Sequence, residues 1–479
     1  MHRALTCVDI LDEVFIWFDI ANFFGAFNCV DDDRICTLAR SARVCKAFFQ
    51  PAIRVLWRRL EYVTVIFHTL PSFVKVHEDK PRTYGGLPRP EYRLPRDVPS
   101  AEWDRLSIYA VYVETLHASQ EPSVRTEEMT QDSWRSLKEL CHDKPIFPNL
   151  RDLFWLIDDD GPESIIPFLS PTIKWLSLFC STPPWDFTPD RAREWQKHIR
   201  VVIGEISARV PLLRELSVST CRPMPPSFAT TPLSDANFIE LRVLGLYSAE
   251  PLRPSDLAAV SRIASLESLE LSVVDCKVHD PTDHLLPVCF NNLRRLRLDR
   301  QSAVDGVFDL FTAPSLQRLD VHDFRINNTS DLRRMCAAWA RSFPALQELI
   351  CMLDEHDTTG WEPSSISSLV APFCGLRGLS TLCVWLNSLQ VTVDDHDLST
   401  FAEAWPSLKT LIVQGNSETV PDDFIAGLPG LIALAKQCPH LQDLRLSGVR
   451  VRSEDVAQLP RDSPVLRFRY LWRDYSSLP

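Results

Sequence analysis

A spacing of leucines recurs along most of the chain, and the segment NNLRRLRLDR shows it clearly. Here Leu293, Leu296 and Leu298 follow the pattern L-x-x-L-x-L, and the last two leucines alternate with arginines. Alternation with a period of two places successive side chains on opposite faces of an extended chain. The pattern therefore predicts a short strand that buries its leucines and exposes Arg295 and Arg297.

The same spacing occurs eleven times between residues 150 and 446. The copies are LRDLFW from Leu150, IKWLSL from Ile173, LRELSV from Leu213, LRVLGL from Leu241, LESLEL from Leu266, LRRLRL from Leu293, LQRLDV from Leu316, LQELIC from Leu346, LSTLCV from Leu379, LKTLIV from Leu408 and LQDLRL from Leu441. A weaker copy, VETLHA, starts at Val113. The intervals between the eleven copies average roughly 29 residues, which is typical of a repeat architecture.

Helical patterns lie between the predicted strands. Residues 254–266, 330–343 and 401–408 carry apolar side chains three or four positions apart. Each unit of strand and helix has an apolar edge that only a neighbouring unit can cover. The chain resembles proteins with irregular leucine-rich repeats. This implies an α/β solenoid over residues 106–479, with a parallel concave sheet and helices on the convex side.

Outward-facing strand positions are the candidate target-binding residues, because aromatic and arginine side chains carry much of the binding energy at interfaces. The set comprises Trp175, Phe179, Tyr247, Arg295, Arg297, Arg318, His322 and Trp385. Ile350 and Met352 occupy equivalent positions. Each of these side chains could instead be solvated or pack against a loop. A nucleic-acid patch around Arg295 is disfavoured by the acidic residues nearby, which include Asp299 and Asp320.

The N-terminal region has a different pattern, which predicts a small helical module over residues 1–75. Apolar side chains follow helical spacing between residues 5 and 18, with acidic residues between them. Residues 35–60 then predict two short helices, and Pro51 fits near the start of the second. A module of this size has a marginal core of its own, so part of its stability is expected to come from a partner.

Paired aliphatic and aromatic residues of this module follow a known motif: Leu5, Ile10–Leu11, Val14–Phe15, Val44–Cys45, Phe48 and Leu56–Trp57. In these residues the module resembles an F-box. Thr6 and Phe48 stand where the F-box pattern has proline and tryptophan. An F-box followed by irregular leucine-rich repeats is similar to F-box-like proteins of mushroom-forming fungi. The resemblance implies binding to a Skp-type adaptor and through it to a cullin–RING ubiquitin ligase. The implied adaptor contacts are Leu5, Ile10, Leu11, Phe15, Leu38, Val44, Phe48, Leu56 and Trp57.

Residues 76–105 are rich in proline and contain Gly85 and Gly86. This composition favours a linker between the helical module and the repeats, or a loop lying over the first repeats.

Composition and motifs narrow the class of protein. The net charge of −12 gives no general attraction to nucleic acid. The fourteen cysteines include no C-x-x-C pair and no zinc-ligand spacing, which favours reduced thiols. Acidic residues interrupt the apolar N-terminus, and no apolar run reaches the roughly 18 residues of a membrane span. A cytoplasmic or nuclear protein is therefore expected. No phosphate-binding glycine loop, G-x-S-x-G or H-E-x-x-H motif occurs, so no catalytic residue, metal or cofactor is assigned.

Two functions follow from this organisation. The first is a non-enzymatic substrate receptor of a cullin–RING ligase, in which the repeats bind a protein target. The second is a scaffold whose N-terminal helices only cap the end of the solenoid. A cap should bury Leu56 and Trp57 against the first repeat, whereas an adaptor-binding module should leave an apolar patch open. An enzyme would need a cluster of titratable groups on the concave face that strand spacing does not reveal.

Overall fold

The computed structural model divides into two compact units, Met1–Leu241 and Arg242–Pro479. It describes residues 7–19, 32–80, 89–118, 128–157, 164–180, 189–220, 233, 238–247, 252, 254–272, 288–299, 311–326, 329–354, 364–386, 391–415 and 425–450. Leu5, in the predicted adaptor set, lies outside these residues.

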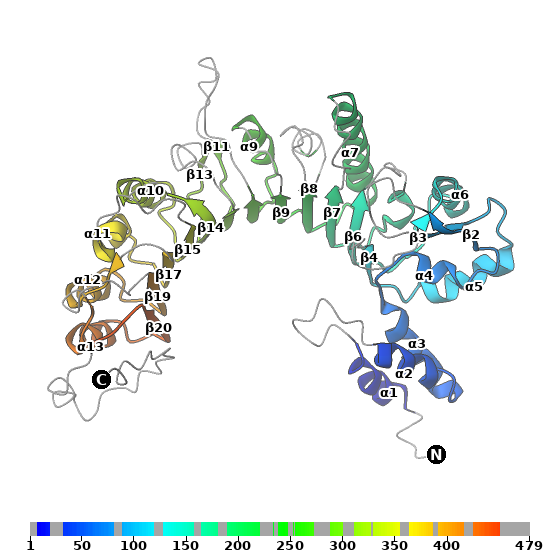
Figure 1. The fold of residues 1–479 in the computed structure, drawn as a ribbon, viewed down its shortest axis with the longest axis horizontal. Helices are drawn as coiled ribbons and strands as arrows, with labels where there is room; N and C mark the ends of the chain where they lie inside the picture. Colours follow the sequence, from blue (N-terminus) through cyan, green and yellow to red (C-terminus); the bar gives the residue numbers. More distant parts are fainter. Residues whose placement is uncertain are drawn as a thin grey trace. The chain divides into compact units, whose positions relative to one another are not determined.

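The described part of the first unit contains five strands of a parallel sheet that are joined in the order of the chain (Figure 1). They are β1 (Arg59–Leu60), β4 (Thr115–Ala118), β6 (Asp152–Ile157), β7 (Trp175–Cys180) and β8 (Glu215–Thr220). In β6 and β8 buried side chains alternate with partly exposed ones. The strands predicted from Leu150, Ile173 and Leu213 are confirmed, and the weaker copy from Val113 forms β4.

Eight further strands of the same kind lie among the described residues of the second unit. They are β9 (Val243–Tyr247), β10 (Ser268–Leu271), β12 (Arg295–Asp299), β14 (Arg318–Arg325), β15 (Glu348–Asp354), β17 (Thr381–Leu386), β19 (Thr410–Gly415) and β20 (Asp443–Leu446). Successive strands pair in parallel with one leucine opposite the next, as for Leu269, Leu296 and Leu319. All eleven predicted copies therefore form parallel strands.

The helices cover one side of the strands in the second unit, where they lie on the outside of an arc of strands (Figure 1). They are α9 (Pro254–Val260), α10 (Thr329–Ser342), α11 (Ile366–Val370), α12 (Asp395–Ala404) and α13 (Leu428–Gln437). The 3-10 helix η5 (Ala371–Gly375) follows α11. Large aromatic side chains of this unit are fully buried, among them Trp339, Phe373 and Trp405. The indole N–H of Trp405 donates to the carbonyl of Phe373 at 3.1 Å. This packing confirms the predicted helix-and-strand repeat.

Short paired strands lie outside the two main series. In the second unit β11 (Val288–Cys289) pairs with β13 (Phe311–Thr312), and β16 (Ser364–Ser365) pairs with β18 (Val391–Thr392). In the first unit the helices after the N-terminal module include α6 (Gln131–Cys141) and α7 (Pro189–Arg209), with the 3-10 helix η3 (Ile166–Phe168).

Three helices form the N-terminal part of the first unit: α1 (Val8–Ile16), α2 (Asp32–Ser41) and α3 (Lys46–Arg58). The two helices predicted within residues 35–60 correspond to most of α2 and to α3. Helix α3 continues directly into strand β1, which the leucine spacing did not predict. These helices are therefore covalently continuous with the parallel sheet.

Residues 76–105, expected to form a linker, include regular structure. The segment contains the end of β2 (Val74–Lys80), all of β3 (Arg89–Arg93) and the first half of α5 (Ser100–Ala110). Strand β3 pairs with β2 and with β5 (Glu128–Met129), and the short helix α4 (Thr64–Phe67) precedes β2. Because β1 precedes this segment, the parallel sheet begins before the boundary that the sequence predicted for it.

Carboxylates at the N-terminus of α12 connect three consecutive helices. Asp397 caps its own helix by accepting from the Asp394 N–H at 3.0 Å, and it also bonds the hydroxyl of Ser365 at the start of α11. Asp395 Oδ1 accepts from the N–H groups of Gly427 at 2.7 Å and Gly430 at 3.0 Å, at the start of α13. Negative charge near a helix N-terminus is favourable, so these bonds fix the stacking of the helices.

Replacement of Gly430 by alanine should weaken this stacking. A Cβ at this position would lie 2.6 Å from Asp395 Oδ1 and 2.8 Å from the Asp395 Cα. Relief of such an overlap moves backbone, which costs about 1–3 kcal/mol. We expect Gly430→Ala to lower the denaturant midpoint, measured by circular dichroism. Gly378→Ala is the matched control, because a Cβ there meets no atom within 4 Å. Equal midpoints for the two variants would contradict the packing described.

Candidate functional site

The N-terminal helices α1–α3 share a small apolar core. Leu11 and Phe15 of α1 are buried against Leu38 of α2 and Ile53 of α3. The ring of Phe48 meets that of Phe15 edge-on, with centroids 5.6 Å apart. The sequence of α1 pairs apolar residues, and one member of each pair points into this core. The other member of each pair consequently points away from it.

The outward members form an exposed apolar stripe along α1 and its C-cap residue, which we define as Ile10, Val14 and Trp17 and call the stripe of α1. Their exposed fractions are 44%, 48% and 71%. Positions i, i+4 and i+7 lie along one side of a helix, so these side chains are neighbours. Val44, in the turn between α2 and α3, and Phe49 of α3 are also exposed. Clustered exposed apolar side chains are typical of interaction surfaces.

The predicted adaptor-binding residues fall into three groups in the structure. Leu11, Phe15 and Leu38 lie in the core, whereas Ile10 and Val44 are exposed. The others are half-buried at the edge of the core: Phe48, Leu56 and Trp57. Val14 and Trp17 were not among the adaptor contacts predicted from the sequence. Their signal was the helical spacing from Ile10, which identifies the face that the core does not use.

Trp57 links α3 to the following structure. Its ring stacks on that of Tyr109 in α5, with centroids 5.0 Å apart. Leu56 is half-buried against the core of the N-terminal helices. The contact expected of a capping module is therefore present at Trp57, while the open patch expected of an adaptor-binding module is present on α1. The two features lie on different helices and do not exclude each other.

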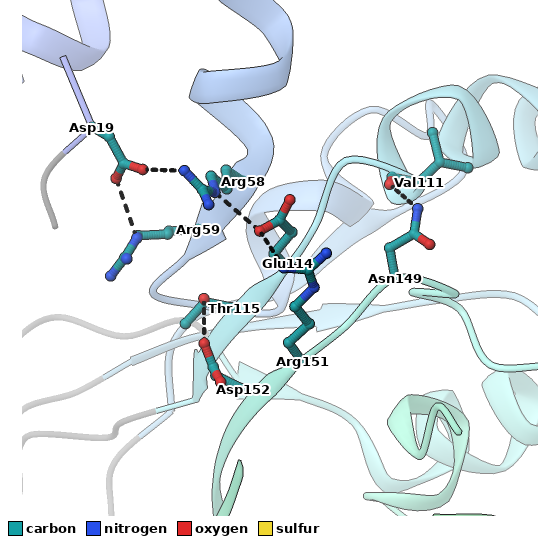
Figure 2. A network of polar contacts seen from close by, with 9 residues as sticks. All are labelled: Asp19, Arg58, Arg59, Val111, Glu114, Thr115, Asn149, Arg151 and Asp152. Atoms are coloured by element: carbon teal, nitrogen blue, oxygen red, sulfur yellow. Dashed lines mark hydrogen bonds and ion pairs between the residues drawn. The ribbon is translucent and has the colours of Figure 1, made fainter. Parts of the chain in front are cut away.

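Charged side chains reinforce this junction (Figure 2). Asp19, which is 5% exposed, lies 2.8 Å from Arg58 Nη1 through one oxygen and 3.2 Å from Arg59 Nε through the other. Arg58 Nε is in turn 3.1 Å from Glu114 Oε2, just before strand β4. Arg151 Nη1 approaches the same Glu114 oxygen at 4.0 Å. The chain after α1, the end of α3 and the first repeat are thus joined by one network.

In the first unit, the predicted target-binding residues Trp175 and Phe179 are half-buried. His117 lies beside Phe154 and Trp175, with ring centroids 6.3 Å and 6.5 Å away. Burial, and then the nearby Arg59 charge, lower the pKa of His117, so its imidazole is neutral at neutral pH. The Trp175 indole N–H donates to Glu215 Oε1 at 2.8 Å. We call His117, Phe154 and Trp175 the aromatic cluster.

In the second unit, the predicted target-binding residues also avoid full burial. Arg295 and Arg297 are exposed, and the others are half-buried: Tyr247, Arg318, His322 and Trp385. The Tyr247 hydroxyl bonds the Glu270 carboxylate, and burial followed by this bond raises the pKa of Tyr247. Arg297 Nε lies 3.2 Å from Asp299 Oδ1. These charged groups largely satisfy one another.

Acidic partners also surround Arg318, at 2.9 Å from Asp320 and 3.1 Å from Glu348. On the next strands the outward positions become apolar. They are Ile350 and Met352 on β15 and Trp385 on β17.

Some outward positions of the second unit are buried, and two of them carry side chains of chemical interest. Cys383 and Ile412 have the parity of exposed residues but are 4% and 6% exposed. Burial is the main cause that raises the pKa of the Cys383 thiol to about 11, so this cysteine is neutral at neutral pH.

Among the described residues, no group of three histidine, cysteine or carboxylate side chains is placed to hold a metal ion. The helices within the described ranges include none that combines the length and apolar character of a membrane span.

No protein-family model matches this chain. No curated protein matches it either. Among solved structures, the crystal structure of a TLR13–ssRNA13 complex is similar, with 12% sequence identity over 70% of this chain and a TM-score of 0.21. The chain spans 60% of the length of that protein. A similarity this low does not identify the fold. The fold is therefore assigned from the strands and registers given above.

The junction around Asp19 should contribute more to stability than the other aspartate–arginine pair of the N-terminal helices. Asp19→Ala removes an almost buried carboxylate from two arginines, and we expect a loss of about 1–3 kcal/mol. Asp12→Ala is the control, because the Asp12–Arg54 pair at 2.7 Å is 32% and 52% exposed. Exposed pairs contribute about 0–1 kcal/mol. Urea denaturation measures the loss of stability in each variant, and hydrogen exchange of the α1 amides shows whether that loss is local. Equal losses for Asp19→Ala and Asp12→Ala would contradict the role given to Asp19.

Proposed function

We propose that this protein is a non-enzymatic substrate receptor of a cullin–RING ubiquitin ligase. In this role the N-terminal helices bind a Skp-type adaptor, and the outward faces of the strands bind a protein target. Catalysis of ubiquitin transfer belongs to other subunits, and the receptor contributes proximity between target and enzyme. Such a protein works in the cytoplasm or nucleus.

The apolar stripe of α1 is the observation that supports this role most directly. The opposite face of the same helix already has a complete core, so folding does not need Ile10, Val14 and Trp17 to be apolar. Exposed apolar side chains on so short a helix cost solubility unless a partner covers them. Burial of one such side chain by a partner contributes about 1.5–3 kcal/mol. A helical adaptor with an apolar groove fits this stripe.

The junction supports the second part of the proposal. A receptor has to hold its target at a fixed place relative to the ligase. In the first unit α3 passes into β1 without a linker, and Asp19, Arg58 and Glu114 join the helices to the first repeat. A short covalent connection with partly buried charge contacts restricts hinge motion. The N-terminal helices and the first repeats therefore suit the transmission of a fixed orientation.

A protein-interaction scaffold is the alternative, and the stacking of Trp57 on Tyr109 favours it. A solenoid needs a cap that covers the open edge of its first repeat. If capping were the complete role of the N-terminal helices, the stripe on α1 would have no partner. The two functions thus differ in whether a Skp-type adaptor binds α1.

Co-purification with a Skp-type adaptor tests the proposal. We expect the unaltered chain to form a complex, and Ile10→Asp combined with Val14→Asp to lower its affinity at least about a hundredfold. Two carboxylates at the centre of an apolar contact would be buried without partners, which accounts for a loss of this size. Isothermal titration calorimetry of the purified adaptor measures the affinity of each protein. Leu11 is unsuitable for this test because it is a core residue.

Val201→Asp is the matched control, since Val201 is an apolar residue of α7 that is 47% exposed. It adds a carboxylate to an exposed helix of the same unit and should leave adaptor binding unchanged. Absence of a complex with the unaltered chain would favour the scaffold. A complex that survives the double substitution would place the adaptor elsewhere.

A further inference from the structure

The residues that precede β6, β7 and β8 in the first unit form a regular row at the N-terminal ends of these strands, next to Glu114 before β4. The Lys174 N–H donates to the Arg151 carbonyl at 2.8 Å, and the Arg214 N–H donates to the Lys174 carbonyl at 2.9 Å. Neighbouring parallel strands are about 4.8 Å apart, so the three side chains start from adjacent points. Three consecutive basic residues therefore stand in one row, which we call the basic ladder.

The side chains of the basic ladder are available to a partner. All three are exposed. Lys174 and Arg214 form no ion pair with any residue that the structure describes. Arg151 has only the 4.0 Å approach to Glu114, which is closer to Arg58.

The carboxylates nearest to the basic ladder in sequence have other partners. Asp152 accepts from the Thr115 hydroxyl at 3.2 Å, and Glu215 accepts from the Trp175 indole. They consequently leave the positive charge of Lys174 and Arg214 uncompensated.

The fold does not require positive charge at this position. In the second unit the equivalent row contains Arg242, Glu267, Arg294 and Gln317, and Arg242 pairs with Glu267 at 3.4 Å. Like charges on adjacent strands repel, so three basic residues in succession are less favourable than a mixed row. The chain as a whole has a net charge of −12, so this local run is opposite in sign to the chain. A bound anionic group would relieve the repulsion.

The aromatic cluster identifies the kind of anion. Phe154 lies three residues after Arg151 on β6, Trp175 directly follows Lys174 on β7, and His117 stands opposite Phe154 on the neighbouring strand β4. At about 3.3 Å per residue these separations are short enough for one peptide to reach both groups. The partner would combine acidic side chains with an apolar one. A nucleic-acid strand fits less well, because Asp152 and Glu215 would repel phosphates placed near the aromatic rings.

We propose that the basic ladder and the aromatic cluster together bind an acidic peptide segment of a protein target. Carboxylates of the segment pair with Arg151, Lys174 and Arg214, and an adjacent apolar side chain packs on Trp175 and Phe154. This inference deepens the proposed function by specifying the chemistry of the target. It rests on the proposed function in one respect, namely that a protein target occupies the strand face.

Fluorescence anisotropy with the full chain tests the inference. The probe is a fluorescein-labelled peptide in which glutamates flank two leucines. We expect Lys174→Gln combined with Arg214→Gln to weaken its binding about tenfold or more, and added salt to weaken binding to the unaltered chain. Arg294→Gln combined with Lys409→Gln is the matched control. These residues occupy the same strand position in the second unit and are exposed, and neither has a basic neighbour on the adjacent strands of its row, so the control removes the same charge without breaking a basic run.

The unaltered chain provides an independent test through the peptide. Replacement of the glutamates by glutamines should abolish binding, since the peptide then keeps its shape but loses its charge. Equal binding of the glutamine peptide, or equal weakening by the control pair, would overturn the inference. So would a phosphoserine peptide or a poly-uridine oligonucleotide that binds where the glutamate peptide does not.

The adaptor experiment separates this result from the proposed function. We expect the Lys174→Gln and Arg214→Gln variant to retain the Skp-type adaptor, because neither residue belongs to the N-terminal helices. Loss of peptide binding with adaptor binding intact assigns the effect to the ladder. A chain that binds the peptide but no adaptor would refute the ligase role and leave the acidic-segment site in place.

Discussion

The stacking of leucines between successive strands is the interaction on which the rest of the structure depends. In the second unit Leu269, Leu296 and Leu319 stand opposite one another on paired strands, and each is at most 1% exposed. Burial of one leucine contributes about 1.5–3 kcal/mol. No single repeat could bury these side chains alone, so each strand is stable because its neighbours are present. Any insertion that shifted a strand by one residue would expose this row.

Because the inward row holds the fold together, the outward row is free to vary. Along one register of the second unit the side chains change from Arg297 and Asp320 to Ile350 and Cys383. The backbone hydrogen bonds keep these side chains about 4.8 Å apart, whatever their chemistry. A series of repeats can therefore present charged, aromatic and apolar surface in succession without cost to the core. The same reasoning explains why the basic run of the first unit has no equivalent in the second.

The sequence predicted the strands well because the alternation within each copy of L-x-x-L-x-L specifies locally which side chains are buried. It did not predict β1, since Arg59 and Leu60 form a strand only through pairing with Thr115 and Leu116. It also could not decide which member of the Ile10–Leu11 pair faces the core. Both residues are apolar, and the choice depends on where α2 and α3 lie.

The burial of Cys383 and Ile412 shows the same limit of the sequence. Alternation assigns both residues outward, but neighbouring side chains cover them. The fold could therefore be predicted from local pattern, whereas the exposure of individual site residues depends on tertiary packing.

The N-terminal helices show how one small module can have two surfaces. Its fixed end is held to the first repeat by the continuous α3–β1 backbone, by the stacked rings of Trp57 and Tyr109, and by the buried carboxylate of Asp19. Helix α1 contributes Leu11 and Phe15 to the core and leaves its other side apolar and uncovered. A cap for the solenoid and a docking surface for a partner are thus compatible roles, because attachment stabilises the same helix that would be presented.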